Sequence, residues 1–145
     1  MLFNYVEKHG DPLYELINST IDPERKLFFV HGGTDVEDRE EVRQITETES
    51  NAIIVASYGT FSTGINIKRL HNIVFASPSK SRIRNLQSIG RVLRKGEGKD
   101  IATLYDIADD IGGQNYTLKH LNERVNIYND ENFKYEVIKV NLRAS

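Results

Sequence analysis

The chain has 145 residues, 39% of them hydrophobic, a net charge of −2 and no cysteine. This length is typical of a single domain with its own core, and the hydrophobic content excludes disorder over the whole chain. The missing cysteines exclude disulfide scaffolds, cysteine-based zinc sites and thiol catalysis.

The sequence also argues against membrane insertion and secretion. The longest apolar runs, such as residues 52–56, have the length of a strand and fall well short of the ~18 residues of a membrane helix. The first residues lack the basic stretch and the cleavage site of a secretory signal. We therefore expect a soluble protein of the cytoplasm. Because the first predicted strand begins at Met1, a chain cut from a longer protein is favoured.

Positive charge is concentrated in the middle of the chain. Nine Lys and Arg residues lie between Lys68 and Lys99 with one acid, Glu97, whereas residues 7–49 carry twelve acids and five bases. A basic stretch in an otherwise acidic chain indicates a surface that faces an anion. On charge alone, a solvated helix face explains the pattern equally well.

Short apolar strands alternate with helical patterns along the chain. In chain order, we predict a strand at 1–5, a helix at 12–19, a strand at 26–30, a helix at 36–48, a strand at 52–57, a loop to residue 64, a strand at 72–76, a helix at 81–94, a strand at 101–107 and a helix at 117–128. This alternation predicts an α/β fold, a parallel sheet covered by helices on both faces, with its ligand-binding loops at one edge. Without repeats or linkers, residues 1–145 form one predicted domain.

The end of the chain is expected to extend this domain. Residues 116–145 would add the last helix and an edge strand, because apolar and charged side chains alternate from Phe133 to Val137. Asp109 and Asp110 follow a predicted strand and are interpreted as residues that start a helix. Tyr116, Tyr128 and Tyr135 are interpreted as core or edge residues and not as platforms on which bases stack.

The most informative segment is Gln-Ser-Ile-Gly-Arg-Val-Leu-Arg at 87–94. At about 100° per residue, Gln87, Arg91 and Arg94 share one face of a helix, while a separate stripe is apolar. Two guanidinium groups beside an amide can bind phosphate in a bidentate manner. Spacing alone leaves open an amphipathic surface helix with scattered arginines.

This segment resembles motif VI of the superfamily 2 helicases, and the other motifs of the second RecA-like lobe of that family precede it in order. Residues 1–5 resemble motif IV, residues 29–33 with the helix that contains Arg39 resemble the unit between motifs IV and V, residues 54–67 resemble motif V, and residues 72–78 resemble the strand that follows it. The resemblance covers residues 1–110 and is greatest to the UvsW-type recombination helicases of tailed phages. It implies the second lobe of an ATP-dependent DNA helicase.

The resemblance also implies the role of each motif residue. Arg94 would be the arginine finger at the γ-phosphate, with Arg91 and Gln87 as the other catalytic groups. Gly64 would let the backbone approach the nucleotide. Asn66 stands where many relatives have Asp. It would still contribute to nucleotide binding, by a hydrogen bond to a ribose or to the main chain, but it could not form an ion pair with Arg91. Expected contacts with nucleic-acid phosphates are Asn4, His31, Gly32, Gly33, Ser57, Tyr58, Thr63 and Lys80.

The chain lacks the motifs expected of the first lobe. The glycines of 59–64 have the spacing of a P-loop, but Ile65 and Asn66 stand where Lys and Ser or Thr are required, so Walker A and an acidic Walker B box are both missing. ATP with Mg²⁺ is therefore expected between this lobe and an N-terminal RecA-like lobe that supplies the Mg²⁺ ligands, and the chain alone is expected to be inactive. The four histidines share no metal-ligand spacing, and His31 is interpreted as capping or packing its loop.

The implied substrates are single-stranded or branched DNA in recombination, repair and replication-fork remodelling. A non-catalytic nucleic-acid or protein-binding module with a RecA-like fold is the main alternative. A Rossmann-like nucleotide-sugar enzyme is disfavoured, because no Gly-x-Gly-x-x-Gly follows a strand.

Overall fold

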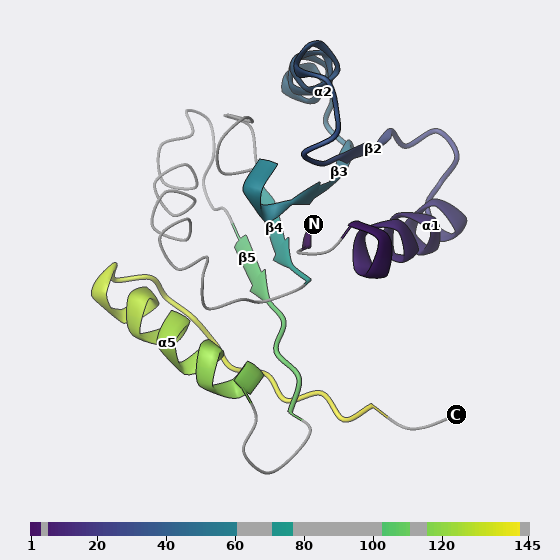
Figure 1. The fold of residues 1–145 in the computed structure, drawn as a ribbon. Helices are drawn as coiled ribbons and strands as arrows, with labels where there is room; N and C mark the ends of the chain where they lie inside the picture. The colour runs from purple at the N-terminus through teal and green to yellow at the C-terminus, as the bar shows by residue number, and fades with distance from the viewer. Residues whose placement is uncertain (4–5, 61–70, 77–102, 111–115, 143–145) are drawn as a thin grey trace.

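The computed structural model contains a five-stranded parallel sheet (Figure 1) and describes residues 1–3, 6–60, 71–76, 103–110 and 116–142. The strands are β1 (Leu2–Phe3), β2 (Leu27–Val30), β3 (Ile53–Ser57), β4 (Asn72–Phe75) and β5 (Thr103–Asp106). They are ordered β2-β3-β1-β4-β5, and every pair is parallel. The predicted α/β fold is confirmed, and the five strands predicted between residues 1 and 107 are all present.

The described helices are α1 (Asp11–Thr20), α2 (Val36–Thr48) and α5 (Tyr116–Asp130), with a π-helical turn, η1 (Val6–Gly10), directly before α1. Pro12 lies in the first turn of α1, where a missing N–H costs no intrahelical bond. The first turn of helix α2 contains Glu37 and Asp38, whose negative charges are favoured at the positive end of the helix dipole. The turn η1 was not predicted, and the predicted helix at 81–94 lies outside the described residues.

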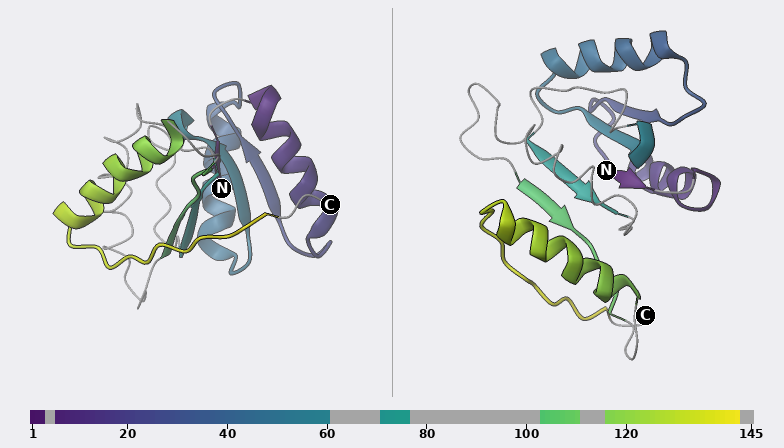
Figure 2. Two further views of the ribbon diagram at one scale, coloured as in Figure 1. Left: turned by 90° about the horizontal axis from the view of Figure 1, so that it is seen from below. Right: turned by 60° about the vertical axis from the view of Figure 1, so that its left-hand side comes forward.

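Helices α1 and α2 cover opposite faces of the sheet. The Tyr14 ring of α1 lies 5.3 Å from the Phe29 ring of β2, whereas Val42 of α2 packs against the core cluster that contains Val30. Because successive residues of a strand point to opposite faces, Phe29 and Val30 mark the two sides. Figures 1 and 2 show the same arrangement, with β2 and β3 between the two helices.

The core lies on the face of the sheet that packs against α2 and α5. Its buried side chains are Val30, Ala56, Tyr58, Ile73, Phe75 and Tyr128. The rings of Tyr58 and Phe75 meet edge to face, with centroids 5.4 Å apart. Burial of these side chains joins β2, β3, β4 and α5 into one packed unit.

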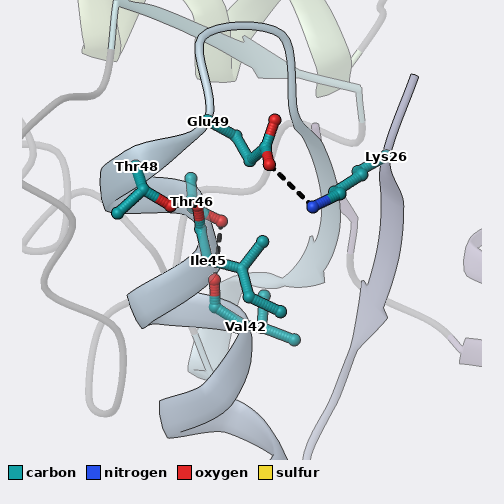
Figure 3. Close-up of polar contacts among 6 residues, drawn as sticks. All are labelled: Lys26, Val42, Ile45, Thr46, Thr48 and Glu49. Atoms are coloured by element: carbon teal, nitrogen blue, oxygen red, sulfur yellow. Dashed lines mark hydrogen bonds and ion pairs between the residues drawn. The ribbon is translucent and has the colours of Figure 1, made fainter. Parts of the chain in front are cut away.

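The end of α2 returns to the start of β2 (Figure 3). Lys26 Nζ lies 2.6 Å from Glu49 Oε1, and both side chains are largely exposed, so the pair contributes less than about 1 kcal/mol to stability. Within α2, the Thr46 hydroxyl donates to the carbonyl of Val42 at 2.7 Å. The position of α2 therefore depends mainly on its apolar contacts with the sheet.

A buried polar cluster attaches α5 to β5. Arg124 donates from Nε and Nη2 to the two carboxylate oxygens of Asp106 at 2.6 and 2.8 Å, and the Tyr128 hydroxyl donates to the same carboxylate at 2.5 Å. Arg124 and Tyr128 are one turn apart on α5, and both are buried. Burial, followed by the Asp106 charge, raises the pKa of the Tyr128 hydroxyl, which stays protonated and donates.

Two predictions for connecting segments are wrong. Residues 58–60, predicted as loop, are helical because Ser57 caps them, and residues 133–142 form no strand because none of the described strands pairs with them. Asp109 and Asp110 lie in an irregular segment after β5, and the residues that follow them, 111–115, lie outside the described part of the chain, so their interpretation as residues that start a helix stays a prediction.

Removing one partner of the Asp106–Arg124 pair should strongly destabilise the fold. Asp106→Ala leaves the Arg124 charge buried without a counter-charge, so we expect the free energy of unfolding to fall by about 3–5 kcal/mol in urea denaturation. Glu40→Gln is the matched control, because Glu40 forms an exposed ion pair with Arg43, and it should change stability little. A loss no larger for Asp106→Ala than for Glu40→Gln would contradict this role.

Tyr128 should make the protein sensitive to alkaline pH. Its pKa is raised in the folded state, so above about pH 10 the unfolded chain loses a proton that the folded chain retains. The stability that Tyr128 contributes is therefore present below pH 10 and lost as the pH rises. Tyr128→Phe should be less stable by about 1 kcal/mol at neutral pH, and the difference from wild type should shrink between pH 9 and 11 in urea denaturation. A constant difference would contradict this.

Candidate functional site at the carboxyl edge of the sheet

The parallel strands bring several predicted site residues to one edge. Val30 of β2 is paired in register with Ala56 of β3, so His31 and Ser57, the next residue of each strand, are neighbours at the carboxyl edge. The register of Phe3 with Ser57 brings the end of β1 to the same place. Sequence reasoning placed the nucleic-acid contacts in these loops, and the structure brings their described members together.

The turn after β2 is closed by its own hydrogen bonds. The backbone N–H of His31 donates to the Thr34 hydroxyl at 3.1 Å, the N–H of Thr34 donates to the His31 carbonyl at 3.0 Å, and the N–H of Gly33 donates to His31 Nδ1 at 3.0 Å. The interpretation of His31 as a capping residue is confirmed. Nδ1 accepts this bond, so in this geometry the proton of a neutral ring is on Nε2.

The two glycines of this turn differ in what they can offer a ligand. The N–H of Gly33 is already used by His31, whereas Gly32 is exposed and no described residue accepts a hydrogen bond from its N–H. A Cβ added to Gly33 would lie 2.9 Å from His31 Cε1, but one added to Gly32 would meet nothing within 4 Å. Gly32 is thus the glycine of this turn whose N–H no described residue uses, whereas the N–H of Gly33 could reach a phosphate only by leaving His31 Nδ1.

The segment after β3 begins a helical turn that Ser57 caps. The Ser57 hydroxyl donates to the Thr60 hydroxyl at 2.7 Å and accepts from the Thr60 N–H at 3.4 Å. Ser57 is partly exposed at the edge, but its hydroxyl hydrogen is engaged. Tyr58 is 3% exposed and packs on Phe75, so the expectation that it contacts nucleic acid does not fit this structure.

All the predicted catalytic and nucleotide-binding residues, Gly64, Asn66, Gln87, Arg91 and Arg94, fall outside the described part of the chain. So do three of the predicted nucleic-acid contacts, Asn4, Thr63 and Lys80. Their roles stay predictions from the sequence. Among the residues that the structure does describe, no group of three or more His, Asp or Glu side chains is placed to hold a metal ion.

Sequence reasoning missed the Asp106–Arg124–Tyr128 cluster at the end of β5. Its signal was present, because Arg124 and Tyr128 have the spacing of one helix face and Asp106 ends an apolar strand. The tyrosine interpretation is confirmed for Tyr128, which lies in the core, whereas the Tyr116 side chain lies outside the described part of the structure. In the described helices, none is long and apolar enough to span a membrane.

The chain belongs to the helicase conserved C-terminal domain family, whose sequence profile matches residues 3–96. It is 41% identical to the ATP-dependent DNA helicase uvsW of Enterobacteria phage T4 over an alignment that covers 98% of this chain and 30% of that protein. The resemblance drawn from the motifs is confirmed, and the chain spans less than a third of this curated relative. No solved structure matches the chain significantly.

Two matched alanine variants test whether the hydrogen bond from Gly33 to His31 stabilises the turn after β2. Gly33→Ala should displace the His31 ring and break the Gly33 hydrogen bond to Nδ1, lowering the free energy of unfolding by about 1 kcal/mol. Gly32→Ala should change it by less than about 0.5 kcal/mol, because its Cβ points into open space. Urea denaturation measures both, and amide exchange at residue 33 reports the broken bond. Equal effects of the two variants would contradict this.

Proposed function

We propose that the chain is the second RecA-like lobe of an ATP-dependent DNA helicase, which hydrolyses ATP between this lobe and an N-terminal RecA-like lobe of the same protein. The proposal rests on the match to the helicase family, together with a parallel sheet whose loops meet at one edge. The similarity to the T4 protein, an ATP-dependent DNA helicase, supports it. Because the chain spans under a third of that relative and lacks the Walker motifs, the activity belongs to the whole protein.

The turn at residues 31–34 is the described part of the proposed nucleic-acid interface. Gly32 offers an exposed backbone N–H, the kind of donor that contacts phosphate without reading sequence. Ser57 can take part only if its hydroxyl hydrogen turns away from Thr60 to a phosphate oxygen. Asn4, Thr63 and Lys80 complete the proposed contact. We infer that the bound strand is single-stranded or branched DNA, held through its backbone.

The residues of motif VI would act on the nucleotide. In this proposal Arg94 reaches the γ-phosphate as negative charge develops there, with Arg91 and Gln87 beside it. Gly64 and Asn66 would line the nucleotide on this lobe. Mg²⁺ would accompany ATP and neutralise phosphate charge, with its ligands on the N-terminal lobe, which would carry the Walker motifs that this chain lacks. Opening and closing of the lobes would move the protein along one strand.

By its resemblance to the UvsW-type helicases, we place this activity in recombination, repair and replication-fork remodelling in the host cytoplasm. The alternative is a non-catalytic nucleic-acid or protein-binding module with the same fold. The two differ in whether arginine at position 94 affects ATP turnover in the full-length protein. The role of Arg94 is thus the decisive test.

In the full-length helicase, Arg94→Ala should lower the rate of DNA-stimulated ATP hydrolysis by at least about 10²-fold while ATP affinity changes little. An arginine finger meets the γ-phosphate mainly in the transition state, so it contributes to the rate more than to binding. Arg94→Lys should not restore the rate, because an ammonium group lacks the planar fork of a guanidinium. Steady-state ATPase and nucleotide-binding measurements on the same variants give the result.

Arg43→Ala is the matched control for this experiment. Arg43 lies on α2 and pairs with Glu40 on the surface, so its loss should leave turnover unchanged. Normal turnover in Arg94→Ala would reject the arginine-finger assignment. A full-length protein that binds DNA but hydrolyses no ATP would favour the non-catalytic module.

A further inference from the structure

The exposed apolar side chains gather at the C-terminal side of the domain. Nine large hydrophobic side chains are exposed in the described residues, and all but two lie in β5 and the segment just after it, or in residues 135–142. They are Tyr105, Ile107, Tyr135, Val137, Ile138, Val140 and Leu142, with 47–90% of each residue exposed. We call this set the C-terminal apolar surface. Such a concentration typically marks an interaction site.

Residues 133–142, which we call the tail, are apolar on both sides. In an extended chain, side chains alternate between two sides, so Tyr135 and Val137 share one side, whereas Ile138, Val140 and Leu142 share the other. The tail has no Gly or Pro, and it is rich in β-branched and aromatic residues. Contact with one flat surface would bury only one side. A strand that is covered on both sides would bury the whole pattern.

The tail begins at Phe133, which packs against the core, and it contacts the body of the domain again further along. The Tyr135 ring lies 6.3 Å from the buried Tyr128 ring of α5, and Lys139 Nζ lies 3.9 Å from the Asp110 carboxylate in the segment after β5. The second contact joins the tail to the segment that follows β5 and contains Ile107. Figure 1 shows the tail returning past α5 and then passing the segment after β5. The tail therefore begins on the α5 side of the sheet and passes the end of β5.

Strand β5 adds an open backbone edge to this surface. It is the last strand in the sheet order and pairs only with β4 among the described strands. Leu104 and Asp106 point toward α5, where Asp106 binds Arg124, so Tyr105 and Ile107 point to the opposite face. Helix α1 covers that face at β2, at the other end of the sheet. Within the described part of the chain, no strand pairs with the outer edge of β5, and Tyr105 and Ile107 are exposed on the face opposite α5.

We propose that the C-terminal apolar surface docks against the rest of the helicase polypeptide, outside this chain, and that the tail becomes a paired strand in that contact. This inference rests on the proposed function, because it requires the chain to be one lobe of a longer protein. The occupant is an apolar surface with an open strand edge. The contact would join the two parts of the protein at a place that contains none of the motif residues.

Two observations favour this occupant over a second copy of the chain. The alignment with the T4 helicase covers 98% of the chain, so the tail belongs to the shared sequence, while about two thirds of that relative lies outside the match. A covalently linked segment also has a high effective concentration, so it captures an exposed strand more readily than a separate molecule does.

Hydrogen exchange on the full-length helicase tests the inference. At a concentration where sedimentation shows a monomer, we expect the backbone amides of residues 135–141 to exchange at least ~100-fold more slowly than in an unstructured peptide. Exchange at the rate of an unstructured peptide would overturn the proposal. Protection that appears only with dimer formation would also overturn it, in favour of a second copy.

Single substitutions then test both sides of the tail. Val137→Asp and Val140→Asp place a charge on opposite sides, and each should speed exchange of the tail amides by at least tenfold, with β2 and β3 amides unchanged as evidence of folding. Asn126→Asp is the control, since it adds the same charge at an exposed polar position of α5, outside the tail, and should leave exchange as in wild type. Equal effects of all three variants, or none from either valine variant, would overturn two-sided burial.

The outcome is independent of the test of Arg94. An unprotected tail in a protein whose ATPase depends on Arg94 defeats only the docking inference. A protected tail in a protein whose turnover survives Arg94→Ala defeats only the assignment of the catalytic arginine.

Discussion

Because all five strands pair in parallel, each connection must run from the carboxyl edge of the sheet back to its amino edge. In the two connections that are fully helical in the described residues, α1 and α2 supply that return and cover opposite faces, which is why Phe29 meets α1 and Val30 faces the core on the side of α2. The same constraint places His31 and Ser57 side by side, although they are 26 positions apart in the sequence. The candidate site is thus a consequence of the pairing, and the loops themselves contribute only its chemistry.

At this edge, the side chains that could bind a ligand are also used to hold the loops. His31 accepts from Gly33, and the Ser57 hydroxyl caps the turn that begins at Tyr58. A phosphate that binds there competes with these internal hydrogen bonds for Ser57, but not for the exposed Gly32 amide. Backbone donors held by a closed turn need no reorganisation when an anion arrives. The geometry favours contact through Gly32 and leaves the Ser57 hydroxyl as a cap unless it rotates.

The far end of the sheet is held in a different way. Burying Asp106 and Arg124 carries a desolvation cost that well-packed apolar side chains would avoid, so the pair is weak evidence for added stability. Its two parallel hydrogen bonds, with the third from Tyr128, instead fix one orientation of α5 on β5. That orientation directs the tail past Asp110 and leaves its apolar side chains exposed.

Local patterns in the sequence determined the strands, the parallel α/β fold and most helix bounds. The bounds of α2 are those predicted, because its acids, its polar face and its apolar Val42 and Ile45 are all properties of neighbouring residues. The motifs also identified the helicase family. Tertiary structure decided what depends on distant partners. The tail has the composition of a strand, but none of the described strands pairs with it. Tyr58 is buried against Phe75. Arg124 binds Asp106, which lies 18 positions away in the sequence. A strand requires a partner's hydrogen bonds and a buried charge requires a counter-charge, and neither partner can be read from residues adjacent in the chain.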